Sequence, residues 1–108
     1  MGFRDAKERT IRALANGDFQ FEERAVVESK NLLDTGDITD EQLVQLLKRC
    51  RGTQYEERPH VWDHDTMCHV FSPEDRNQKR WYIKVYFLSD SGSEVAVFIS
   101  VHRARGSS

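Results

Sequence analysis

The chain has 108 residues, of which 38% are hydrophobic and 31% charged, and its formal net charge is −2 at pH 7. Such a chain is too apolar to stay disordered, and its length suits one domain with one hydrophobic core. The weak net charge argues against a general nucleic-acid coat protein, and no apolar run approaches the roughly 20 residues of a membrane span.

Residues 1–105 are therefore expected to form a single domain, with residues 106–108 as a native tail or a cloning remnant. The charged residues 1–10 lack the apolar stretch of a signal peptide. Two cysteines, Cys50 and Cys68, are too few for a disulfide framework. We expect a cytoplasmic protein with reduced thiols and no membrane partner.

Charge divides unevenly along the chain. Residues 1–47 carry six basic and ten acidic side chains, a net −4, whereas residues 48–108 carry ten and eight, a net +2. The second half is thus electropositive, which permits a local phosphate-binding site.

Two helices are predicted before residue 38. The first covers residues 5–16, because Ile11 and Leu14 share one face and Gly17 occupies the position of a C-terminal capping glycine. The second covers residues 22–34. Its inward face would carry Ala25, Ser29, Leu32 and Leu33.

A third helix has the strongest pattern in the chain. Thr39 is its expected N-cap and Gln42 the reciprocal partner of a capping box, with Ile38 as part of a hydrophobic staple. Apolar residues then recur at helical spacing, at Leu43, Leu46, Leu47 and Cys50. Gly52 is expected to close the helix.

The second half of the chain is predicted to be a sheet. A polar loop over residues 53–65 precedes three strands, at residues 67–72, 80–88 and 94–103. Because the links between the strands are short, the strands should form an antiparallel meander. The expected fold class is therefore α+β, with N-terminal helices packed on one face of a C-terminal antiparallel β-meander.

Alternation along the last two strands separates two faces of this meander. One face of the second strand is apolar, with Trp81, Ile83, Val85 and Phe87, and one face of the third strand is equally apolar, with Val95, Val97, Ile99 and Val101. We expect these two faces to pack together under the helices, because burying a large side chain contributes about 1.5–3 kcal/mol. The opposite face would then gather Tyr82, Lys84, Tyr86, Ser100 and His102.

Such a face has two interpretations. A one-sided sheet often exposes a polar, solvated surface without further function. The face can also bind RNA, because it combines phenols, a lysine and a terminal histidine, with Arg103 and Arg105 nearby. Such groups can hold phosphate, stack on bases and transfer protons.

Four short motifs resemble the MqsR family, the motility quorum-sensing regulator toxins of the RelE-like bacterial ribonuclease group. They are Tyr55 in a loop after a helix, Val70-Phe71-Ser72-Pro73, Tyr82-Ile83-Lys84, and Phe98-Ile99-Ser100-Val101-His102. The resemblance implies a RelE-like fold and a type II toxin–antitoxin toxin, a metal-independent and cofactor-free mRNA endoribonuclease. It also implies two partners, a cognate antitoxin protein and mRNA, free or on the ribosome.

The resemblance also implies site residues. Tyr82 occupies the position of the family's active-site tyrosine, and His102 a position that often holds a catalytic lysine. Cys68 stands where the family has a glutamine and Glu56 where it has a lysine, and both depart from the pattern. A one-residue bulge would instead put His69 at the glutamine position.

Catalysis rebuilt around histidine is our working hypothesis, because an imidazole suits both proton roles near neutral pH. The expected acid–base pair is His102 with His69 or His102 with Glu56. Lys84 and Arg103 would hold the phosphate, and Tyr82 would orient or stack the substrate. Further substrate contacts are expected from Tyr55, Tyr86, Ser100, Arg103 and Arg105.

Three alternatives accompany this hypothesis. His60, His64, Cys68 and His69 are all possible zinc ligands, but their spacing fits no common zinc frame, so we expect no metal site. Trp62 either covers the core or contacts RNA. The whole chain can also be a non-catalytic RNA- or protein-binding domain on the same fold.

Overall fold

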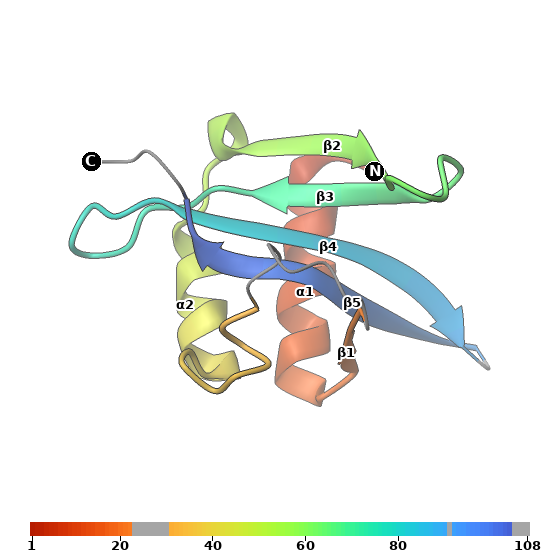
Figure 1. Cartoon of the computed structure of the whole chain (residues 1–108), viewed down its shortest axis with the longest axis horizontal. Coiled ribbons are helices and arrows are strands. Elements are labelled where there is room, and N and C mark those ends of the chain that lie inside the picture. The colour runs from red at the N-terminus through yellow and green to blue at the C-terminus, as the bar shows by residue number, and fades with distance from the viewer. Residues whose placement is uncertain (23–30, 91, 105–108) are drawn as a thin grey trace.

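The structure is a computed structural model that describes residues 1–22, 31–90 and 92–104. It is an α+β arrangement of two helices, a short 3-10 helix and five strands. In chain order the elements are α1 (Phe3–Asn16), β1 (Phe19–Phe21), α2 (Asp40–Arg49), the 3-10 helix (Gly52–Gln54), β2 (Tyr55–Pro59), β3 (Met67–Phe71), β4 (Trp81–Asp90) and β5 (Ser93–Arg103). The strands form one sheet in the order β1-β5-β4-β3-β2 (Figure 1).

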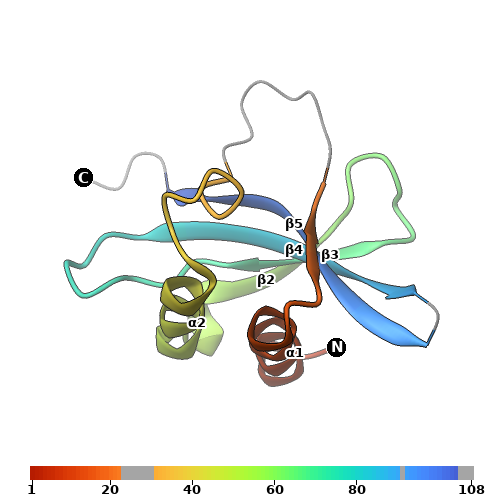
Figure 2. The same ribbon diagram turned by 90° about the horizontal axis from the view of Figure 1, so that it is seen from below.

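Both helices lie on the same side of this sheet, as Figure 2 shows. We call this the helix side and the opposite surface the outer face. The core lies between the helices and the helix side, where Leu14, Leu43 and Leu47 pack with Phe71 and Phe98, all at most 1% exposed. Neither helix of the described ranges is long and apolar enough to cross a lipid bilayer.

Helix α2 begins as its sequence predicts. The Thr39 hydroxyl accepts the Gln42 backbone N–H at 3.1 Å, and the Gln42 side chain accepts the Thr39 N–H at 2.9 Å. Its end differs from the prediction, because Cys50 is already extended and Gly52 starts the 3-10 helix. Helix α2 therefore ends before Gly52, and the chain continues through the 3-10 helix into β2.

The predicted helix over residues 22–34 is wrong in its described part. Asn31 forms a parallel bridge to Val101, and the Leu32 N–H donates to the Val101 carbonyl at 2.8 Å. These backbone groups are committed to β5, so they cannot belong to a helix. Ala25 and Ser29 lie outside the described residues.

Two strands were not expected. Residues 55–59, predicted as a loop, form β2 and pair antiparallel with β3. Residues 19–21 form β1, which pairs parallel with β5. The sheet is therefore five-stranded and mixed, and the predicted antiparallel meander is its β3–β4–β5 part.

A bulge in β5 changes the predicted faces. Lys84 pairs with Ser100 but Val85 pairs with Phe98, which leaves Ile99 without an opposite residue. Beyond the bulge the alternation is reversed, so Ala96 and Phe98 join the core cluster and Val97 lies opposite Tyr86 on the outer face. The prediction that Val95, Val97 and Ile99 belong to the core under the helices is thus wrong, and Val97 is instead buried on the outer face.

Candidate functional site

Two neighbouring rows of side chains on the outer face contain the polar residues that the sequence singles out. Directly paired residues of antiparallel strands point to the same face. One row runs across four strands as Glu56, Val70, Lys84 and Ser100. The next row holds the pair Tyr82 and His102. The structure thus confirms the prediction that Tyr82, Lys84, Ser100 and His102 share the face away from the helices.

His102 is held in one defined orientation. Its ring stacks on the Tyr82 ring, with centroids 5.3 Å apart and planes 21° from parallel. Its Nδ1 lies 2.8 Å from the Arg103 carbonyl oxygen. A carbonyl can only accept, so Nδ1 carries the proton and, in the neutral ring, Nε2 carries the lone pair. The side chain is half-buried at the end of the strand, and in this tautomer Nε2 is the ring nitrogen that can act as a base.

Tyr82 is a neutral phenol among charged neighbours. Burial is the main cause that raises its pKa, with Glu56 adding to the rise and Arg58 opposing it. A tyrosine whose pKa is raised keeps its proton at neutral pH. Tyr82 can therefore donate a hydrogen bond or a proton beside His102.

Arg58 is a functional candidate that sequence reasoning missed. Its Nη2 lies 2.8 Å from Glu56 Oε1, and its charge acts on Tyr82. Both side chains are largely exposed, so this ion pair stabilises the fold little and can open to a ligand. The alternation of Glu56 and Arg58 would have placed both on one face, had residues 55–59 been read as a strand.

Glu56 and His102 are not in contact. Two strands separate β2 from β5, so their backbones lie at least about 14 Å apart at the usual strand spacing. Cys68, at the family's glutamine position, is fully buried and cannot touch a substrate. Neither Glu56 nor Cys68 can therefore act together with His102, and the side chain that contacts its ring is Tyr82.

His69 and Tyr55 lie on the helix side, away from His102. Strand β3 pairs regularly with β2 and with β4, so no bulge turns His69 outward, and it lies opposite Val85. Its ring stacks on Tyr55 at 6.0 Å, and its Nδ1 lies 2.8 Å from the Tyr55 hydroxyl. Tyr55 in turn donates to Glu57 Oε1 at 3.0 Å. Hydrogen bonds thus join His69, Tyr55 and Glu57 on the helix side. The predicted acid–base pair of His102 and His69 is not formed.

His69 predicts a pH dependence of stability. Burial is the main cause that lowers its pKa below the ordinary value of 6.5. The contribution of neutral His69 to the free energy of unfolding is complete above pH 6.5. It is lost as the pH falls from 6.5 towards the lowered pKa of the folded state, because in this range only the unfolded chain takes up the proton. Urea unfolding between pH 5 and 8 should therefore show a steeper fall below pH 6.5 in wild type than in His69→Gln. Equal slopes would contradict this expectation.

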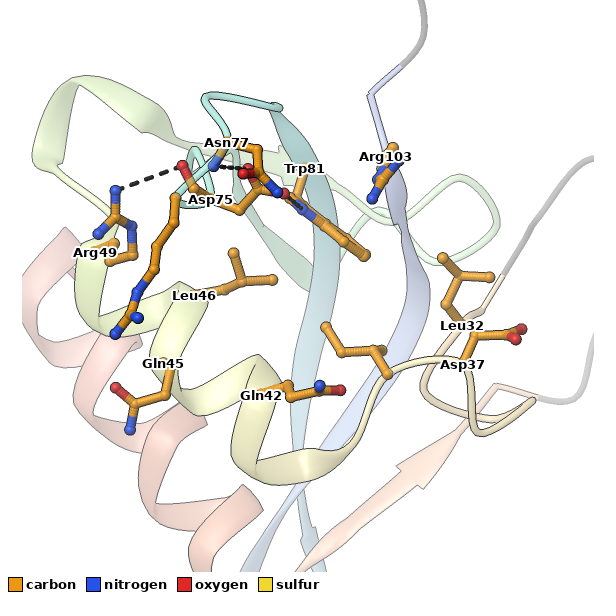
Figure 3. Close-up of a pocket in the computed structure, with 12 residues that line it drawn as sticks. Leu32, Asp37, Gln42, Gln45, Leu46, Arg49, Asp75, Asn77, Trp81 and Arg103 are labelled. Carbon is orange, nitrogen blue, oxygen red and sulfur yellow. Dashed lines mark hydrogen bonds between the residues drawn. The ribbon is translucent and has the colours of Figure 1, made fainter.

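Arg103 belongs to a different surface. Its guanidinium lies 5.8 Å from the Trp81 ring on the helix side, in a groove of about 750 Å³ between α2 and the β3–β4 loop. Figure 3 shows Arg103 and Trp81 facing this groove, with Asp75 bonded to the Trp81 indole at 3.1 Å. The expected joint binding of phosphate by Lys84 and Arg103 is therefore not supported by their placement. Arg105 lies outside the described residues.

Tyr86 lies on the outer face at a position of β4 that is remote from His102. Its hydroxyl donates to Glu22 Oε1 at 3.3 Å, and its ring meets the His60 ring edge-on at 5.4 Å. His60 and Glu22 were not predicted to belong to this face, since no local pattern connects the end of β1 with a loop 38 residues later. In the described ranges, no group of three or more His, Cys, Asp or Glu side chains could hold a metal ion.

Comparison with protein-family models, with curated proteins and with solved structures gave no match. Function therefore has to be inferred from the chemistry of the outer face.

Proposed function

We propose that this chain is a metal-independent endoribonuclease that cuts mRNA on the outer face of its sheet, and that it acts as the toxin of a type II toxin–antitoxin pair. The observation that carries the proposal is the contact of His102 Nδ1 with the Arg103 carbonyl, which leaves Nε2 as the basic nitrogen of the neutral ring, beside the Tyr82 phenol and near Lys84. RNA contains its own nucleophile, the ribose 2′-hydroxyl, so cleavage needs a base, an acid and a cation.

His102 is the base of this proposal. Its Nε2 removes the proton from the 2′-hydroxyl, and the Arg103 carbonyl, which accepts a hydrogen bond from Nδ1–H, stabilises the imidazolium that forms. The 2′-oxygen then bonds to phosphorus, and the bond from phosphorus to the 5′-oxygen breaks. The products are a 2′,3′-cyclic phosphate and a 5′-hydroxyl.

Tyr82 is the proposed acid, because it is the proton donor that stacks on His102. It gives its proton to the departing 5′-oxygen, and exchange with water then returns both side chains to their starting state. Lys84 lies one row away and Arg58 acts on Tyr82, so both can stabilise the charge that develops on phosphate.

The departures from the resembled family fit this arrangement. Glu56 holds Arg58 rather than taking part in proton transfer. Cys68 and Val70 lie on the outer face between these side chains but are buried there, so they do not contact a substrate. The helix-covered sheet with an active outer face is also consistent with a RelE-like fold, which we propose for this chain.

A toxin of this kind must be neutralised by a partner protein. Expression of the chain in bacteria should therefore arrest growth, and co-expression of the product of an adjacent small gene should restore it. Tyr82→Phe keeps the ring stack but lacks the proton, so it should relieve the arrest partly or fully. Unimpaired growth with abundant wild-type protein would favour the non-catalytic binding domain instead.

A further inference from the structure

The groove between α2 and the β3–β4 loop is not used by the proposed cleavage chemistry. It lies on the helix side, away from His102, and has a volume of about 750 Å³. We call it the arginine groove, because its lining includes Arg49, Arg76 and Arg103, all of which are exposed. A concave surface with several cations attracts a ligand of opposite charge.

The β3–β4 loop forms one wall of the arginine groove and is held in place by hydrogen bonds. Asp75 Oδ1 accepts two backbone N–H groups of the loop, at 2.8 and 3.0 Å, and its Oδ2 accepts the Trp81 indole N–H at 3.1 Å. Arg49 Nε donates to the Glu74 carbonyl at 3.0 Å, which joins α2 to this loop. The wall is therefore in place before a ligand arrives, so binding requires little further ordering.

The positive charge of the groove is not neutralised within the part of the chain that the structure describes. The lining contains three arginines and two aspartates, so 3 − 2 gives a net +1. Asp75 already accepts three hydrogen bonds, and the Asp37 carboxylate accepts the Thr35 hydroxyl. No carboxylate of the described ranges forms an ion pair with an arginine of the groove. The arginines can therefore pair with carboxylates of a ligand.

The arginines are spread along the groove. The Arg103 guanidinium lies 5.8 Å from the Trp81 ring, and a guanidinium over an aromatic ring still presents its N–H groups in its own plane. Figure 3 shows Arg49 and Arg103 on opposite sides of Trp81. Separated cations suit several carboxylates on one chain better than a single phosphate group.

The groove also has an apolar lining, formed by Leu32, Ile38, Leu46 and Trp81. Ile38, Leu46 and Trp81 keep only 5, 6 and 8% of their surface exposed. Since the hydrophobic contribution scales with the apolar area removed from water, these strips add little, and charge dominates the affinity. Trp81 offers no open ring face on which an RNA base could stack, so a peptide is favoured over a nucleic acid.

We propose that the arginine groove binds an acidic segment of a partner protein. Carboxylates of this segment pair with Arg76 and Arg103, and its apolar side chains cover Leu46 and Trp81. The groove and His102 lie on opposite sides of the sheet, so this inference does not rest on the proposed function. Because exposed ion pairs are individually weak and screened by salt, the complex is sensitive to ionic strength.

The test is fluorescence anisotropy with a short dye-labelled peptide of glutamate, leucine and serine, and with a counterpart in which lysine replaces every glutamate. The full chain should bind the first peptide, more weakly as salt is raised, and should not bind the second. The double variant Arg76→Gln, Arg103→Gln should weaken binding by about 5- to 25-fold, since one exposed ion pair contributes up to about fivefold and separate pairs add. Arg76→Glu alone, on the exposed loop, should also weaken binding and provides a second variant if the double variant unfolds.

Arg80→Gln is the matched control, because Arg80 is exposed on the same connection between β3 and β4 but does not line the groove. It should leave the affinity for the acidic peptide unchanged within about twofold, since a more distant charge is screened. Equal binding of both peptides, or equal affinity of wild type and the folded arginine variants, would overturn the proposal. Loss of RNA binding or of self-association in these variants, without any binding of the acidic peptide, would assign the groove to RNA or to a second copy and would equally overturn it.

Discussion

Replacing His102 with alanine should lower the rate of RNA cleavage by about 10²- to 10⁴-fold, the usual loss when a general acid or base is removed. The effect follows from the fixed Nε2 lone pair, for which the described outer face offers no second imidazole next to Tyr82. The free energy of unfolding should fall by only about 1 kcal/mol, because a half-buried side chain at the end of β5 loses one ring stack and one hydrogen bond. The measurement is a cleavage time course of purified protein on labelled single-stranded RNA.

Two variants serve as controls for His102→Ala. His102→Lys should retain part of the activity if a cation at this position stabilises the developing charge. Val101→Ala removes two methyl groups from a fully buried neighbour, so it should cost about 2 kcal/mol of stability but leave the rate per folded molecule unchanged. Wild-type rates in His102→Ala would remove His102 from the mechanism.

Replacing Phe98 with alanine should destabilise the fold by about 3–5 kcal/mol, the usual cost of removing a buried phenylalanine. Phe98 is fully buried, belongs to the core cluster and meets Phe19 edge-on at 6.1 Å. A loss of this size is a large part of the 5–15 kcal/mol that holds a small domain together. Urea unfolding at fixed pH measures it directly.

The matched control for Phe98→Ala is Ile99→Ala at the bulge. Ile99 is half-buried and has no residue opposite it, so its truncation should cost clearly less. Without the bulge, strand alternation would place Ile99 in the core and Phe98 on the outer face. A larger loss for Ile99→Ala than for Phe98→Ala would therefore refute the observed register.

Prediction from the sequence is correct for elements whose residue pattern is compatible with a single structure. The capping box at Thr39 and Gln42 locates α2, since it satisfies two backbone N–H groups that the start of a helix leaves without partners. On β4, Trp81 and Ile83 alternate with Tyr82 and Lys84, and only one register buries the apolar pair.

The sequence predicts poorly where both alternatives bury apolar surface. In β5, Val97 and Phe98 are both apolar, so the alternation cannot show that a bulge turns Phe98 inward. Strand β2 is missed for another reason, because as an edge strand it carries Glu56, Glu57 and Arg58. Charges on an edge protect it from pairing with other chains and also hide it from a search for apolar alternation.

The residues of the candidate site also fall into those that local sequence predicts and those that it does not. Tyr82, Lys84 and His102 follow from the alternation along β4 and along the part of β5 from Ser100 onwards, where the predicted and observed faces agree. Arg58 depends on recognising β2, and the contact between Glu22 and His60 depends on tertiary packing that no local pattern encodes.

The central claim is that the outer face cuts RNA by activating its 2′-hydroxyl without metal. The most direct test is cleavage of a single-stranded RNA in EDTA, with a matched substrate that carries a 2′-O-methyl group at the cut position. Wild-type protein should cleave the first RNA, leave a 2′,3′-cyclic phosphate and a 5′-hydroxyl, and spare the methylated substrate. Equal cleavage of both RNAs, or no cleavage of either by folded protein with or without ribosomes, would contradict the claim.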